Sequence, residues 1–212
     1  MNMEYNVVWS HLYQPGMEHL RLVQHEDGIY ADGLVIAVVD DVPARVHYHI
    51  RCDPVWRVRE LRVELLDEAG FSSMDDPSSV DNPRAGVNPA PTLHVYADGQ
   101  GHWAMASGDA LPDLDGCIDV DISVTPFTNT LPIRRLALAP GAFQEIVVAY
   151  IKVPDITLQP FKQRYTCLNI QEQGGTYRYA SIVSGFTADL SVDNEGLVIS
   201  YPGIFQRAWP LS

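Results

Sequence analysis

Two aspartates separated by one residue are the first candidates for chemistry in this 212-residue chain. Asp119 and Asp121 would share one face of a strand, because side chains two positions apart point the same way. Paired carboxylates are what glycoside hydrolysis needs, but neighbours on one strand rarely flank a bond from opposite sides. Three interpretations stay open: hydrogen bonding to a ligand, structural salt bridges with Arg134 and Arg135, or acid–base catalysis.

His47 and His49 share a strand face in the same way, as two metal ligands can. A zinc site needs further ligands, and the other histidines are scattered without a motif. Residues 113–116 resemble part of a calcium loop, but the spacing is wrong and no glutamate closes the loop. There is no Gly-x-Ser-x-Gly and no glycine-rich phosphate loop. We therefore predict no metal, no cofactor and no assignable catalytic residue.

Arginines are concentrated in neighbouring expected strands of an otherwise acidic chain. Guanidinium groups bind carboxylate or phosphate through paired hydrogen bonds, and aromatic faces pack against sugars or acyl chains. Together, the arginines and aromatic residues suit binding of an amphiphile with an anionic or polyhydroxyl head. The alternative is that the arginines pair with the surplus acidic residues and the tryptophans fill the core. The residues that we predict to contact the ligand are Trp56, Arg57, Arg59, Trp103, Asp119, Asp121, Asn129, Arg134, Arg135 and Tyr179. The apolar positions expected to line or back the cavity are Val147, Ile151, Leu190 and Ile199.

The composition disfavours several classes of partner. A net charge of −13 argues against nucleic acid and against docking on an anionic membrane surface. No signal peptide is visible at the N-terminus, and the longest apolar runs fall far below the ~20 residues of a membrane helix. Cys52, Cys117 and Cys167 are widely spaced and odd in number, which indicates buried free thiols. We expect a cytoplasmic protein without integral membrane association.

The dominant pattern is that of strands. Residues 45–52 alternate apolar and basic side chains, and residues 186–193 alternate similarly before a turn at 193–196. Residues 143–153 are apolar on both faces, which predicts a strand covered on both sides. Only residues 130–136, with a Thr or Asn cap and an early proline, indicate a helix, of about two turns.

These patterns predict one all-β domain over residues 1–212, with one or two short helices. Long antiparallel sheets avoid exposed edges by curling or closing. A many-stranded, strongly curved antiparallel sheet forming a barrel or half-barrel is therefore our first choice, and a sandwich is the second. Residues 70–91 are too long for an ordinary connection, and we expect a mobile loop, a flap or an insertion there.

One long motif resembles a known family. It reads Asp-Gly-Cys-Ile-Asp-Val-Asp-Ile over residues 115–122 and Thr-Pro-Phe-Thr-Asn-Thr-Leu-Pro-Ile-Arg-Arg-Leu over residues 125–136. The motif resembles the bacterial family named "putative glycolipid-binding". The resemblance covers almost the whole chain except residues 70–91. Further matching residues are Trp9, Glu18, Trp56-Arg57-Val58-Arg59, Asp98-Gly99-Gln100-Gly101-His102-Trp103, Gln163-Arg164-Tyr165, Tyr177-Arg178-Tyr179, Gly196-Leu197-Val198 and Tyr201-Pro202.

The resemblance implies a strongly curved β-sheet, similar to that of bacterial lipoprotein and lipid carriers. We predict that the protein binds a small amphiphilic, glycolipid-like ligand in an apolar cavity without chemistry. The runner-up is a hydrolase of a sugar or lipid derivative that uses Asp119 or Asp121. A third reading makes the 115–136 motif purely architectural, with a buried arginine–carboxylate network that holds a corner of the barrel.

Overall fold

The described part of the chain folds around one sheet of 14 strands. The computed structural model describes residues 3–66 and 91–211, so the loop expected at 70–91 lies outside the described residues except for Pro91. The strand order is β7-β6-β5-β4-β3-β2-β1-β14-β13-β12-β11-β10-β9-β8. The β8–β9 pair is parallel, and the other pairs are antiparallel. The strands are β1 (Met3–His11), β2 (Gly16–Gln24), β3 (Ile29–Val39), β4 (Val42–Cys52), β5 (Val58–Leu65), β6 (Thr92–Ala97), β7 (Trp103–Met105), β8 (Asp119–Ile122), β9 (Phe143–Lys152), β10 (Thr157–Gln171), β11 (Gly174–Ser181), β12 (Thr187–Val192), β13 (Val198–Tyr201) and β14 (Phe205–Trp209).

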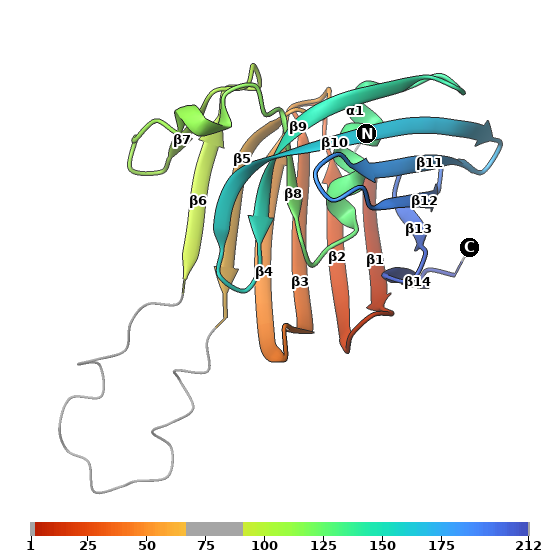
Figure 1. The fold of residues 1–212 in the computed structure, drawn as a ribbon, viewed down its shortest axis with the longest axis horizontal. Helices are drawn as coiled ribbons and strands as arrows, with labels where there is room; N and C mark the ends of the chain where they lie inside the picture. Colours follow the sequence, from red (N-terminus) through yellow and green to blue (C-terminus); the bar gives the residue numbers. More distant parts are fainter. Residues whose placement is uncertain (1–2, 67–90, 212) are drawn as a thin grey trace, which may run out of the picture.

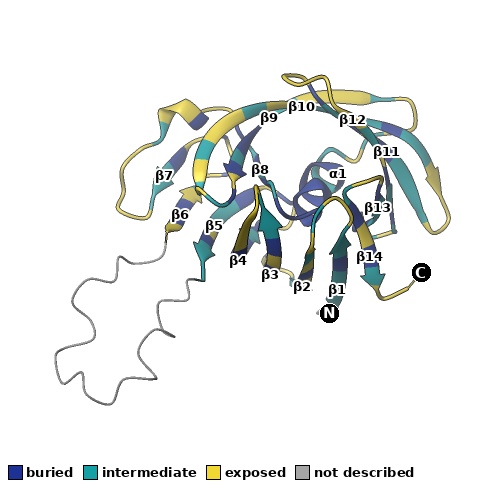
Figure 2. Cartoon of the chain, turned by 60° about the horizontal axis from the view of Figure 1, so that its bottom comes forward, coloured by how far each residue is buried: buried dark blue, intermediate teal, exposed yellow. Residues whose placement is uncertain are grey.

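The sheet is strongly curved but not closed, and β7 and β8 form its two edges. Strands β1 to β6 stand side by side, whereas β9 to β12 cross them in another direction (Figure 1). Figure 2 shows the sheet as an arch, with the helix α1 (Thr130–Leu136) beneath it. The prediction of a strongly curved all-β half-barrel is confirmed, and the second choice of a sandwich was wrong because one continuous sheet forms both halves.

Strand β4 shows how the alternating sequence produces the buried face. From Ala44 to Cys52 its apolar side chains are buried, while the basic side chains between them face outward and are more exposed. Tyr48 of β4 lies directly opposite Gly33 of β3, and a Cβ at Gly33 would come within 2.0 Å of the Tyr48 ring. The glycine therefore makes room for the buried ring. Register shifts in β1, β4 and β10 add the local bending that a curved sheet needs.

Residues 112–136, here called the central segment, lead from the mostly exposed residues 112–116 into the interior of the arch, where residues 124–133 are all buried. Side chains of this segment pack into the core formed with β1 to β5, and Ile133 packs into a second core formed by β10 to β14. The segment is therefore held between the two halves of the sheet. Its elements are η1 (Pro112–Leu114), β8, η2 (Phe127–Asn129) and α1.

Several further predictions can be compared with the structure. The helix expected at residues 130–136 coincides with α1. In β9, Val148 and Ala149 point to opposite faces and are both buried, so the middle of this strand is covered on both sides. The three cysteines are free and buried, as predicted. None of the helices within residues 3–66 and 91–211 is long and apolar enough to cross a membrane.

Candidate functional site

The two aspartates of β8 lie on one face of the strand but have different partners. Asp119 is fully buried and accepts hydrogen bonds from Nε of Arg135 at 2.9 Å and from Nη2 at 2.5 Å. Burial raises the pKa of Asp119, and the Arg135 guanidinium partly offsets this effect. Both oxygens of the Asp119 carboxylate thus already have a partner within the central segment.

Asp121 faces a cleft instead. Its Oδ1 accepts a hydrogen bond from Oγ1 of Thr128 at 3.0 Å, and its Oδ2 accepts one from Nε2 of Gln163 at 2.6 Å. Burial raises the pKa of the Asp121 carboxyl, while these two donors lower it. Asp121 is therefore a desolvated carboxyl group, held in place by neutral donors and directed toward a hollow.

This hollow, here called the aromatic cleft, has a volume of about 280 Å³. Its polar lining includes Asp121, Thr125 and Asn129. Burial raises the pKa of Tyr179 and of Tyr201, and the nearby charge of Asp121 adds to the effect, so both hydroxyls keep their protons at neutral pH. The aromatic side chains that line the cleft are Tyr150, Phe161, Tyr179, Phe186, Tyr201 and Phe205.

A second hollow, the apolar pocket, adjoins the aromatic cleft and has a volume of about 480 Å³. His11 contributes to its lining, and burial lowers the pKa of this imidazole, which favours the neutral form. The apolar residues that line the pocket include Val124, Phe186, Pro202, Ile204 and Phe205. The two hollows are neighbours, because Ser123, Phe186, Ile204 and Phe205 line both of them.

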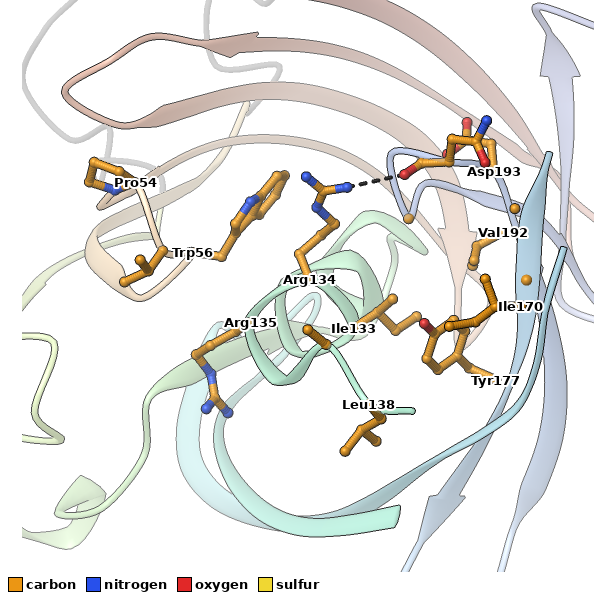
Figure 3. Close-up of a pocket in the computed structure, with 16 residues that line it drawn as sticks. Pro54, Trp56, Ile133, Arg134, Arg135, Leu138, Ile170, Tyr177, Val192 and Asp193 are labelled. Carbon is orange, nitrogen blue, oxygen red and sulfur yellow. Dashed lines mark hydrogen bonds between the residues drawn. The ribbon is translucent and has the colours of Figure 1, made fainter. Parts of the chain in front are cut away.

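A third hollow, the Trp56–Arg134 pocket, has a volume of about 580 Å³ and lies beside α1 (Figure 3). The guanidinium of Arg134 lies 5.3 Å from the centre of the Trp56 ring, a cation–π distance. Its Nη1 also donates a hydrogen bond to the carbonyl oxygen of Asn194 at 3.1 Å. Trp56 has a φ of 65° in the turn between β4 and β5, where Oδ1 of Asp53 accepts backbone hydrogen bonds from Val55 and Arg57.

The ten residues expected to contact one ligand are thus distributed over several places. Trp103 is buried, and its Nε1 donates to the carbonyl oxygen of Cys117 at 2.8 Å. Arg57 is exposed, and Nη1 of Arg59 lies 3.9 Å from Oδ2 of Asp53. Neither arginine lines the hollows described above. The aromatic cleft gathers Asp121, Asn129 and Tyr179. The Trp56–Arg134 pocket gathers Trp56, Arg134 and Arg135.

The four apolar positions expected at the cavity are also divided. Ile151 and Leu190 are fully buried, each in a different core. Val147 is partly buried and lines a separate hollow near Arg135, whereas Ile199 lines none of the hollows described here. Core packing, rather than contact with one cavity, accounts for Ile151 and Leu190.

Sequence reasoning gave no role to a buried polar network beneath the aromatic cleft. Glu18 is fully buried, and its Oε1 accepts hydrogen bonds from the Tyr48 hydroxyl at 2.5 Å and from Oγ1 of Thr125 at 2.8 Å. Burial raises the pKa of Glu18 to about 8. The sequence did contain a signal that Glu18 is buried, because this residue alternates in phase with Leu20 and Leu22 on the buried face of β2.

Comparison with known proteins gives the family. The family model described as "Putative glycolipid-binding" matches residues 6–75 and 79–207. A DUF1089 family protein from Pseudomonas aeruginosa, known from a crystal structure, has a TM-score of 0.74 to this chain; the two are 37% identical, and the match covers 91% of each. A search of the curated proteins found no match. Since the family model extends over nearly the whole chain, including the central segment and the residues of the aromatic cleft, the protein belongs to the family described as putative glycolipid-binding.

Proposed function

We propose that the protein binds an amphiphile with a sugar-like head, with the head in the aromatic cleft and the apolar chain in the apolar pocket. The observation that carries the proposal is that a polar, aromatic hollow lies next to an apolar one and that four residues line both. Their volumes, about 280 and 480 Å³, together suit a small-molecule site of roughly 300–1,000 Å³. The description of the family agrees with such a ligand.

The lining of the aromatic cleft favours a polyhydroxyl head over an anionic one. Among the described residues that line it, none is an arginine or a lysine, and Asp121 would repel an anion when ionised. A carboxylate accepts hydrogen bonds from hydroxyl groups, and tyrosine rings present flat apolar faces with a polar tip. Asp121 would bind hydroxyls of the head, while Tyr179 and Tyr201 would pack against its ring.

The arrangement of Asp119 and Asp121 is more consistent with binding of a ligand without catalysis than with hydrolysis. Asp119 is paired with Arg135 and does not line the aromatic cleft, so a bound sugar would meet only Asp121. Glycoside hydrolysis by the usual mechanisms needs two carboxyl groups at one bond. We place this binding in the cytosol, because the three buried free cysteines suit a reducing compartment.

The test is calorimetric titration with monomeric octyl glucoside, an amphiphile with a neutral sugar head. Phe186→Ala should weaken binding about tenfold or more, because this half-exposed ring lines both hollows. Asp121→Asn, which keeps the shape of the side chain, should weaken binding of the glucoside more than that of a sulfobetaine with the same chain. Phe143→Ala is the matched control, since this ring is exposed and lies outside both hollows.

Arg134→Gln separates the two candidate locations, because Arg134 lines the Trp56–Arg134 pocket and not the aromatic cleft. We expect this variant to bind octyl glucoside like the parent protein. Binding that depends on Arg134 and not on Phe186 would move the site to the other pocket. Equal affinity in the parent protein, Phe186→Ala and Asp121→Asn would overturn the assignment to the aromatic cleft.

A further inference from the structure

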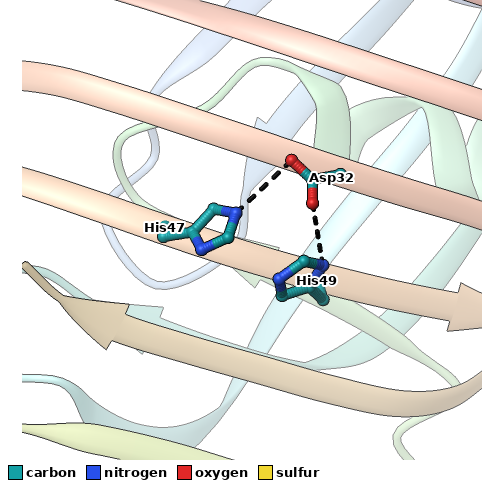
Figure 4. A group of neighbouring side chains, drawn as sticks. All are labelled: Asp32, His47 and His49. Carbon is teal, nitrogen blue, oxygen red and sulfur yellow. Dashed lines mark hydrogen bonds and ion pairs between the residues drawn. The ribbon is translucent and has the colours of Figure 1, made fainter.

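The outer face of the sheet carries a cluster that the proposed function does not use. Asp32 of β3 and His47 and His49 of β4 turn toward one another (Figure 4), and their donor atoms lie within 4.8 Å of one another. Nε2 of His47 is 3.3 Å from Oδ1 of Asp32, and Nδ1 of His49 is 3.0 Å from Oδ2. The register explains the cluster, because Asp32 pairs directly with His49, and His47 follows two positions along the same face.

The spacing of these atoms is close to that around a zinc ion. Zinc–nitrogen and zinc–oxygen bonds of about 2.0–2.2 Å place neighbouring ligand atoms of a tetrahedron roughly 3.3 Å apart. The two nitrogen–oxygen distances of 3.3 and 3.0 Å already have this size. The imidazole rings lie 4.3 Å apart with 69° between their planes, so they are not stacked. Small side-chain rotations on two hydrogen-bonded strands would bring all three donors to one ion.

A further carboxylate lies where it can orient one of the histidines. Oε1 of Glu64, on β5, is 3.6 Å from Nδ1 of His47, the ring nitrogen opposite the one that faces Asp32. Glu64 is in turn held by Nη2 of Arg62 at 2.9 Å. Metal-binding histidines commonly donate their second N–H to a carboxylate, which fixes the tautomer and the ring orientation. Glu64 would thereby leave Nε2 of His47 unprotonated and available to a metal.

The surrounding charges leave Asp32 available to the histidines. Arg21 lies opposite Asp32 on β2, but its Nε donates to Oε1 of Glu4 at 2.8 Å. The side chain of Asp32 is half-exposed, as is that of His49, so an ion from solvent can reach them. Two histidines and one carboxylate are also a ligand set used by zinc proteins that keep a fourth coordination position open.

We propose that Asp32, His47 and His49 bind a divalent transition-metal ion of the zinc class, with Glu64 orienting His47. The fourth position of the ion faces solvent. This site is separate from the proposed amphiphile site, since none of its residues lines the aromatic cleft or the apolar pocket. Failure of one proposal therefore leaves the other unaffected.

The test is calorimetric titration of chelator-treated protein with zinc chloride. We expect one ion for each chain with micromolar affinity, and a loss of about tenfold or more in affinity in His49→Asn and in Asp32→Asn. The replacement Glu64→Gln should cause a smaller loss, because it removes the orienting charge and keeps the three ligands. His102→Asn is the control: His102 forms an exposed pair with Asp98 at 2.8 Å that lacks a second histidine.

Cobalt(II) titration gives an independent readout of the ligands. Visible absorption bands of a site with nitrogen and oxygen ligands, without thiolate charge-transfer bands, would agree with this cluster and exclude the cysteines. The altered side chains lie on the outer face, and thermal unfolding should verify that each variant remains folded. No zinc binding by the parent protein, or binding unchanged in His49→Asn and Asp32→Asn, would overturn the proposal.

Discussion

Replacing Glu18 by glutamine should remove a large pH dependence from the stability of this protein. Glu18 is fully buried on β2; its Oε1 accepts hydrogen bonds from Tyr48 and Thr125, while its Oε2 has no hydrogen-bond partner among the described residues. Burial raises the pKa of Glu18 from 4.5 to about 8, although the two hydroxyl donors lower it. Glutamine has the same shape and cannot ionise, so it imitates the protonated side chain.

The sign of the effect follows from proton binding. Because the pKa of Glu18 is higher in the folded chain, the folded chain keeps this proton after the unfolded chain has lost it. The contribution to stability is fully present below pH 4.5 and is lost as the pH rises through about 8. At about 1.4 kcal/mol for each pH unit, this interval corresponds to about 5 kcal/mol of unfolding free energy.

Urea denaturation at a series of pH values between 4.5 and 9 measures this loss. Other groups titrate over the same range, so the quantity to compare is the difference in unfolding free energy between Glu18→Gln and the parent protein. That difference should grow by about 5 kcal/mol in favour of the variant as the pH rises. Glu145→Gln is the matched control on an exposed glutamate, and its difference should stay within about 0.5 kcal/mol.

Parallel stability curves for Glu18→Gln and the parent protein would refute the reasoning. They would mean that the carboxyl of Glu18 ionises at the same pH in the folded and the unfolded chain. Burial at this position would then not penalise the charged form.

Three further substitutions have expected outcomes. Arg135→Ala leaves the buried Asp119 carboxylate without its guanidinium and should cost about 3–5 kcal/mol in urea denaturation; a loss below about 1 kcal/mol would contradict this. Gly33→Ala brings a Cβ within 2.0 Å of the buried Tyr48 ring and should cost about 1–3 kcal/mol, seen as a lower Tm; an unchanged Tm would argue against it. Tyr48→Phe removes one hydroxyl donor from Glu18 and should move its pH-dependent stability loss to higher pH; the same urea series checks whether the midpoint moves.

Local periodicity was sufficient to predict most of the fold. The alternation in residues 45–52 gives the buried and outer faces of β4, and the early proline at 130–136 agrees with α1. The expected side-chain cap was wrong, because Asn129 and Thr130 donate instead to the carbonyl oxygens of Pro126 and Gly196. A long antiparallel sheet has few ways to protect its edges, so a curved half-barrel followed from the number of strands. These properties depend on residues close together in the chain or on general rules for sheets.

The candidate sites depend on contacts that the spacing of residues does not contain. Asp119 and Asp121 share a face as predicted, but the partner of Asp119 comes from α1, and those of Asp121 come from η2 and β10. The third donor beside His47 and His49 lies on β3 and is brought there only by the strand register. In each case, the two-residue spacing predicted that the side chains share one face of the strand. The tertiary fold determines which groups contact that face.

The structure of the central segment is compatible with both an architectural and a ligand-binding role of the 115–136 motif. The pair of Asp119 with Arg135 fixes the start of β8 to α1, and the alternation of the strand then directs Asp121 toward the aromatic cleft. Thr125, a few residues later, lines the same cleft while it donates to buried Glu18 of β2. Under the proposed function, Asp119 holds the segment in place while Asp121, the next carboxylate on the same face, binds the ligand. Substitutions at Asp119 should therefore be detected first as a loss of stability, and substitutions at Asp121 first as a loss of binding.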